Sequence, residues 1–150
     1  MQAVKKRRVL FVCVGNACRS LMAEAIARQL ASDIMEPSSA GICPLGKVPE
    51  LTKKTLLASG YSLDGLSSKL LRYDALGRAD VIVNISGQSL DGLLGFRVNR
   101  SASAQRIEIW DIKDPYGEEA ATYQKILGEL EGRVLLLARR LRSRKRAASA

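Results

Sequence analysis

The sequence predicts an α/β fold: a single three-layer αβα domain built on a four-stranded parallel sheet. Apolar runs of strand length alternate along the chain with segments of helical periodicity, which is typical of strands joined by right-handed helical crossovers. The chain has 150 residues, a length that fits one domain, and its 47% hydrophobic residues can fill one core. We therefore expect residues 1–150 to form one domain.

Four segments have the character of strands. Residues 9–14 (VLFVCV) form a continuous apolar run, which is typical of a strand buried on both faces of a parallel sheet. Residues 79–85 (ADVIVNI) are expected to form another buried strand, and further strands are expected over residues 34–40 and 106–111.

Three helices are expected between and after these strands. The first begins at Ser20, a residue type that favours a helix N-cap, and its apolar stripe is Met22, Ile26 and Leu30. The second covers residues 50–59 and is closed by Gly60. A long third helix runs from 118 to about 142, with an apolar stripe formed by Ile126, Leu130, Val134, Leu137 and Leu141.

The composition excludes several kinds of chemistry. The chain contains no His, so it has no Ser-His or Cys-His dyad and no imidazole ligand for a metal. Its three Cys residues make neither a disulfide framework nor a zinc site, and we expect no metal and no cofactor. No run approaches the roughly 18 apolar residues of a membrane helix, and the N-terminus does not resemble a signal peptide. These features predict a cytoplasmic protein without a membrane span.

The net charge of +9 is concentrated at the two ends of the chain. Four basic residues lie within 1–8 and six within 139–146, whereas the segment between them is close to neutral. The solvated ends of a strand and a helix explain this pattern, and residues 1–8 and 143–150 are expected to be flexible. The alternative is an electrostatic contact with nucleic acid or acidic lipid. An aromatic content of only 5% disfavours nucleic acid as a partner.

The segment with the clearest chemistry follows the first strand and reads Cys13-Val14-Gly15-Asn16-Ala17-Cys18-Arg19-Ser20. Sites in parallel sheets form at the carboxyl ends of strands. A loop that leads into a helix N-terminus can turn its N–H groups inward and bind an anion. Positive potential at that place favours the thiolate of Cys13, and Arg19 offers a planar fork that matches two phosphoryl oxygens.

Other residues of the loop have supporting roles in this hypothesis. Gly15 permits close backbone approach or a positive φ. Asn16 tolerates a left-handed conformation and can brace the loop, and Ser20 can donate a hydrogen bond to the Cys13 sulfur. The alternative is a simple strand-to-helix turn with a packed cysteine. The complete eight-residue pattern favours a phosphate site in which Cys13 is the nucleophile.

Residues 9–26 (VLFVCVGNACRSLMAEAI) resemble the N-terminal signature of the low-molecular-weight protein tyrosine phosphatases, whose loop reads C-x-G-N-x-C-R-S. The resemblance continues through residues 38–41 (SSAG) and residues 114–116 (DPY), and it spans residues 9–141. Both end motifs are highly specific, whereas the middle of the chain matches loosely. The family fold is a four-stranded parallel sheet flanked by helices, as predicted above.

The resemblance implies hydrolysis of a phosphomonoester in two steps. Cys13 attacks phosphorus, while the loop amides and Arg19 hold the oxygens of the transition state. Asp114 protonates the leaving oxygen and then activates the water that cleaves the phosphocysteine. Asp111, at the end of the fourth strand, is the rival acid, and the family pattern favours Asp114.

Further positions take their expected roles from the same resemblance. Asn16, Ser20 and Ser39 match residues that brace the loop. Cys18 matches a second loop cysteine that can form a reversible disulfide with the nucleophile, and a packed free thiol is the alternative. Cys43 lies outside the signature and is expected to be incidental.

The substrate is the least constrained part of the prediction. Leu45, in the loop over residues 41–49, and Tyr116 are expected to form the rim of the pocket. Ala17 is neither the larger aliphatic residue common in tyrosine phosphatases nor the Thr that marks phosphoarginine phosphatases. We expect a protein tyrosine phosphatase that acts on a phosphorylated protein and binds inorganic phosphate or another oxyanion in its loop. Phosphoarginine hydrolysis and arsenate reduction are the alternatives, although the chain has no cysteine after Cys43 to serve as a thiol relay.

Overall fold

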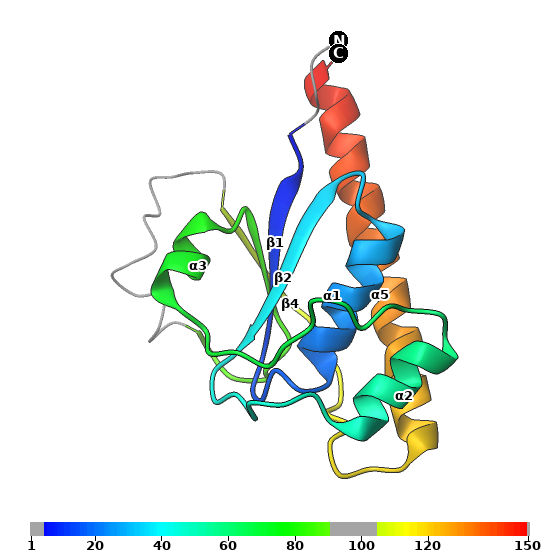
Figure 1. Cartoon of the computed structure of the whole chain (residues 1–150). Helices are drawn as coiled ribbons and strands as arrows, with labels where there is room; N and C mark the ends of the chain where they lie inside the picture. The colour runs from blue at the N-terminus through cyan, green and yellow to red at the C-terminus, as the bar shows by residue number, and fades with distance from the viewer. Residues whose placement is uncertain (1–4, 91–104, 150) are drawn as a thin grey trace.

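The computed structural model describes residues 5–90 and 105–149 and contains a parallel sheet with the strand order β2-β1-β3-β4 (Figure 1). This sheet confirms the predicted α/β fold. Both ends of every observed strand lie within two residues of the expected ends. The strands are β1 Arg7–Cys13, β2 Met35–Gly41, β3 Val81–Asn84 and β4 Arg106–Ile109.

The two faces of the sheet are covered unequally. Val9, Phe11 and Cys13 of β1 pack into a core shared with helices α1 (Arg19–Leu30), α2 (Glu50–Ala58) and α5 (Ala120–Ser149). Leu10 and Val12 face the other way, into a smaller core closed by the short helix α3 (Tyr73–Arg78), and Figure 1 shows α3 on the opposite side of the sheet from α1 and α5. Burial on both faces explains why β1 is continuously apolar.

Three expectations about the helices are wrong in detail. The N-cap of α1 is Cys18, and Ser20 lies inside the helix, where its hydroxyl contacts Cys13 instead of capping a backbone group. Leu30 is 37% exposed, because α1 leaves the core in its last turn and the following residue, Ala31, is buried in its place. Helix α3 was not expected, since it has six residues and buries only Leu76.

The C-terminal basic segment belongs to regular structure, and so do Arg7 and Arg8 at the other end. Strand β1 begins at Arg7, and α5 continues to Ser149, so the flexible end expected from residue 143 is a helix. Arg142 forms two 2.8 Å hydrogen bonds with the Asp33 carboxylate, which holds this part of α5 beside the turn before β2. The expectation for residues 1–4 falls outside the described residues. Among residues 5–90 and 105–149, no helix has the length and apolar character needed to cross a membrane.

Gly41, at the end of β2, lies against the backbone of the loop that follows β1. It pairs with Cys13 in the sheet. A Cβ added at Gly41 would sit 2.7 Å from the Val14 carbonyl oxygen and 2.8 Å from the Asn16 nitrogen. Because both atoms belong to the backbone, a side chain at this position would displace the loop.

Gly41→Ala should therefore lower the free energy of unfolding by about 1–3 kcal/mol, the usual cost of overpacking. The control is Gly128→Ala, at an exposed position of α5 where an added Cβ meets nothing within 4 Å. This control should be neutral or stabilising by up to about 1 kcal/mol, because Ala favours the helix. Urea unfolding followed by circular dichroism measures both values, and equal stabilities for the two variants would contradict the close approach.

Candidate active site

The loop between β1 and α1 is held by its carbonyl groups. The Val14 oxygen accepts a hydrogen bond from the backbone N–H of Cys43 at 2.8 Å, and the Gly15 oxygen accepts one from the N–H of Leu45 at 2.8 Å. The Ala17 oxygen accepts one at 2.7 Å from the hydroxyl of Thr52 on α2. In a trans peptide the C=O and N–H groups point in opposite directions, so carbonyls bound outward turn the following N–H groups toward the interior of the loop.

The N-terminus of α1 opens onto the same interior. Its N-cap residue, Cys18, makes no side-chain cap hydrogen bond, and the first turn contains no acidic residue. The free N–H groups and the helix dipole therefore give this end a positive potential that no capping side chain offsets. Such an end is suited to a bound anion.

Cys13 contacts a pair of buried polar side chains. Its Sγ lies 2.8 Å from the Ser20 Oγ, and the Asn16 Nδ2 donates a 2.7 Å hydrogen bond to that same Oγ. A hydroxyl oxygen can accept one hydrogen bond while its own hydrogen is donated, so Ser20 can donate to the Cys13 sulfur while it accepts from Asn16.

Asn16 has the conformation that the sequence suggested, with φ of 45°. The N–H of Lys69 donates a 2.9 Å hydrogen bond to the Asn16 Oδ1, so the amide joins the loop to the segment after α2. Gly15 does not have a positive φ, and an added Cβ there would meet only the Ala17 Cβ at an ordinary 3.7 Å. The left-handed turn of the loop is therefore made by Asn16 and not by the glycine.

Arg19 is buried and its guanidinium is fixed from two sides. Its Nη1 donates to the backbone oxygens of Ile85 at 2.7 Å and Ile112 at 3.1 Å, beyond the carboxyl ends of β3 and β4. The Arg19 Nε has no hydrogen-bond partner within the described part of the chain. A buried donor of this kind requires a partner, and a phosphoryl oxygen can supply it.

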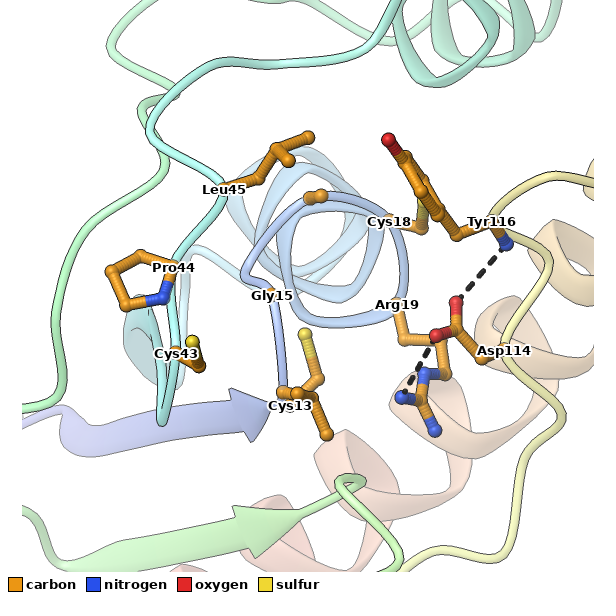
Figure 2. A pocket seen from close by; sticks show the side chains of 11 residues that line it. Cys13, Gly15, Cys18, Arg19, Cys43, Pro44, Leu45, Asp114 and Tyr116 are labelled. Atoms are coloured by element: carbon orange, nitrogen blue, oxygen red, sulfur yellow. Dashed lines mark hydrogen bonds and ion pairs between the residues drawn. The ribbon is translucent and has the colours of Figure 1, made fainter.

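Of the two candidate acids, only Asp114 borders this site. The Asp114 Oδ2 lies 3.6 Å from the Arg19 Nη2, and the Asp114 Oδ1 accepts a 3.1 Å hydrogen bond from the N–H of Tyr116 (Figure 2). The Asp114 side chain is about half exposed. Asp111 borders a different cavity, beside Trp110 on the β4 side of the sheet.

A cavity of about 340 Å³ lies above the loop. Cys13 and Arg19 are 2% and 6% exposed and form its floor, whereas Leu45 and Tyr116 are 38% and 56% exposed and form its mouth. In Figure 2, Leu45 and Tyr116 stand on opposite sides of that mouth. The structure thus places the two expected rim residues in the wall of the cavity. The other lining residues are Val14, Gly15, Ala17, Cys18, Cys43, Pro44 and Asp114.

Cys18 is a packed thiol. Its sulfur lies 3.5 Å from the hydroxyl of Tyr123 and accepts a contact from the Thr52 hydroxyl at 3.6 Å. Burial raises the pKa of the Cys18 thiol, and it also raises the pKa of the Tyr123 hydroxyl, so both groups keep their protons near neutral pH. The three cysteines of the chain are all free.

Several contributors to the site were missed from the sequence. Thr52 and Ser68 bind carbonyls of the loop, and the backbone of Lys69 binds Asn16. Each comes from a segment distant in the chain with no motif around it, so no local signal marked it. Ser39 was expected to brace the loop, but its hydroxyl donates a 2.5 Å hydrogen bond to the buried carboxylate of Glu24.

A comparison with known protein families shows to which family the chain belongs. The family model for the low molecular weight phosphotyrosine protein phosphatases matches residues 8–147. The chain belongs to this family. The match covers the loop with Cys13 and Arg19 as well as Asp114, which lie together in the cavity.

Three proteins to which the chain is similar carry different activities in their names. The chain is 29% identical to arsenate reductase 1 of Bacillus cereus over 86% of its own length and 92% of that protein. It is 26% identical to the YwlE arginine phosphatase from Geobacillus stearothermophilus, with a TM-score of 0.77 over 93% of this chain and 95% of that one. The tyrosine phosphatase Wzb from Escherichia coli K30, solved with sulphate, shares the fold with 21% identity and a TM-score of 0.76, over 91% and 99% of the two chains.

The role of Asn16 can be separated into its conformation and its amide. Asn16→Gly and Asn16→Ala both remove the hydrogen bonds to Ser20 and Lys69, so both should lose about tenfold or more in kcat through misplacement of Cys13. Asn16→Ala must also adopt a positive φ without the tolerance of glycine, and it should be less stable than Asn16→Gly by up to about 1 kcal/mol. Aryl phosphate kinetics and urea unfolding measure the two effects. Wild-type kcat in Asn16→Gly would show that the amide does not position the nucleophile.

Proposed function

We propose that the protein hydrolyses phosphotyrosine on phosphorylated proteins through a phosphocysteine intermediate. The observation that carries this proposal is a cavity with a thiol and a buried guanidinium at its floor and two apolar side chains at its mouth. The three free cysteines fit a reducing compartment, and we place the reaction in the cytoplasm.

In the first step the Cys13 thiolate attacks phosphorus and forms an S–P bond as the bond to the leaving oxygen breaks. The inward N–H groups of the loop and the Nε edge of Arg19 hold the three equatorial oxygens, whose charge grows in the transition state. Asp114 gives its proton to the leaving oxygen. In the second step Asp114 takes a proton from water, the oxygen attacks phosphorus, and the S–P bond breaks to restore the thiolate.

The walls of the cavity favour an aromatic leaving group. A phosphate at the floor directs its ester group outward between Leu45 and Tyr116, which suits a flat apolar ring. Asp114 is the one carboxylate among the described residues that line the cavity, so no second carboxylate is available there to pair with the guanidinium of a phosphoarginine.

Arsenate reduction is a second candidate. The curated relative from Bacillus cereus carries that activity in its name, and arsenate has the charge and tetrahedral shape that the loop would bind in phosphate. In addition, the thiol of Cys43 lies in the wall of the same cavity as Cys13.

A substrate panel tests the proposal. We expect kcat/KM for a phosphotyrosine peptide to exceed that for matched phosphoserine and phosphoarginine peptides by at least about a hundredfold, because only the aryl ester reaches both the floor and the apolar mouth. Arsenate with a thiol reductant should be turned over poorly. Faster turnover of the phosphoarginine peptide or of arsenate would replace the proposed substrate with that one.

Variants at the mouth provide the control for this panel. Tyr116→Ala should lower kcat/KM for phenyl phosphate by about tenfold, which corresponds to one aromatic contact, and should leave small alkyl phosphates nearly unchanged. Leu57→Ala removes an equally exposed apolar side chain from α2, outside the cavity, and should change neither substrate.

The acid is tested by leaving-group dependence. Asp114→Asn should lose about 10²–10⁴-fold in kcat/KM for phenyl phosphate, whose leaving oxygen is basic, and far less for aryl esters with acidic leaving groups. Asp111→Asn is the matched control and should show no such dependence. The measurement is kcat/KM across substituted aryl phosphates, and a steep dependence confined to Asp111→Asn would reverse the assignment.

A further inference from the structure

The two basic ends of the chain meet at one place in the fold. The N–H of Arg7, at the start of β1, donates a 2.8 Å hydrogen bond to the Ile34 carbonyl oxygen. The guanidinium of Arg142, near the end of α5, binds the carboxylate of the neighbouring Asp33. Figure 1 shows the start of β1 and the last turns of α5 at the same end of the molecule. The turn before β2 therefore joins segments from opposite ends of the sequence.

We call this end of the molecule the basic pole. Its described basic residues are Lys5, Lys6, Arg7, Arg8, Arg139, Arg142 and Arg144. Arg142 pairs with Asp33. Arg8 lies 4.0 Å from Glu36, and its N–H donates to the carboxylate of Asp80. The other basic side chains of the pole form no ion pair within the described part of the chain. Positive charge therefore exceeds negative charge at the pole.

The basic pole also exposes an apolar side chain. Leu30, the last residue of α1, is 37% exposed, and its carbonyl oxygen accepts a 3.4 Å hydrogen bond from the Arg142 Nη2. Cations beside an exposed leucine suit anionic phospholipid, because head groups attract the charges and the leucine can enter the boundary of the acyl chains. The described residues of the pole include no aromatic side chain that could stack on a base, which disfavours nucleic acid.

We propose that the basic pole binds the surface of an anionic phospholipid membrane. This inference does not depend on the proposed function, because binding to lipid requires no turnover. Strand β1 begins at the pole with Arg7 and ends at the cavity with Cys13, and its seven residues span about 20 Å. A molecule bound by its pole therefore keeps the cavity open to solution, where it can receive phosphorylated proteins near the membrane.

Sedimentation with vesicles tests the binding directly. The full chain is mixed with vesicles of phosphatidylcholine alone, or of phosphatidylcholine with about one third phosphatidylglycerol. We expect binding to the anionic vesicles to be at least about tenfold tighter, and to weaken as sodium chloride is added, because salt screens the attraction. Equal binding to the two kinds of vesicle, or binding to neither, would overturn the proposal.

Charge reversal tests the position of the binding surface. Arg139→Glu combined with Arg144→Glu should lower the affinity for anionic vesicles by at least about tenfold. The matched control is Lys54→Glu combined with Lys125→Glu, which changes the net charge equally at exposed positions of α2 and of the start of α5. This control should bind within about threefold of wild type. An equal loss in both double variants would show that net charge alone drives binding and would refute the role of the pole.

Two further measurements complete the test. Circular dichroism checks that both double variants are folded, and the milder pair Arg139→Gln with Arg144→Gln should show an intermediate loss of vesicle binding. Duplex DNA is then added to the protein on anionic vesicles, with equal concentrations of DNA phosphate and anionic lipid. We expect most of the protein to stay on the vesicles. Displacement of the protein by the duplex would assign the pole to nucleic acid and overturn the proposal.

Discussion

The outward anchoring of the loop carbonyls is the constraint on which the rest of the site depends. A ring of N–H groups that all face one point is unfavourable unless something holds it, because the dipoles repel one another and compete for the same partners. Here the holding bonds come from three separate segments: the chain after β2, the hydroxyl of Thr52 on α2, and Ser68 in the segment after α2. The fold therefore supplies a pre-formed oxyanion site whose orientation does not have to be created when substrate binds.

The second constraint is the buried guanidinium of Arg19, whose hydrogen-bond donors are only partly paired within the described part of the chain. Arg19 gives one nitrogen to two backbone oxygens and approaches Asp114 with another, and its Nε is left over. Burial of an under-bonded charge is unfavourable, so the free protein holds an arrangement that a bound oxyanion relieves. The same guanidinium lies 3.6 Å from the carboxylate of Asp114, which also lines the cavity.

The residues at the floor of the site could be predicted from the sequence because they lie close together in the chain. Cys13, Asn16, Arg19 and Ser20 lie within eight residues, and each has a chemical reason to stand in a phosphate loop. Asp114 depended mainly on the family resemblance, because its place on the loop before Pro115 did not by itself exclude Asp111.

The supports of the loop could not be predicted, for physical reasons. The groups on Cys43, Leu45 and Lys69 that support the loop are backbone N–H groups, which every residue except proline possesses, so their role depends on where the chain passes. For Ser20 the expected N-cap is wrong, because Cys18 takes that place, whereas the expected contact of its hydroxyl with the Cys13 sulfur is present. Cys43 was judged from the linear motif and dismissed, whereas the parallel pairing of β1 and β2 brings it to the cavity.

The two hydrogen bonds of Arg19 have a consequence for folding. They join residues 66 and 93 positions apart in the chain, so the complete oxyanion site exists only after β1, β3 and the segment beyond β4 have assembled. The complete site is therefore present only in the folded protein, since partly folded chains lack its geometry. Any oxyanion with affinity for the native loop must, by mass action, stabilise the whole domain in proportion to the logarithm of its concentration. For the phosphate ligand proposed above, the concentration in the surrounding solution would therefore add to the stability of the folded chain.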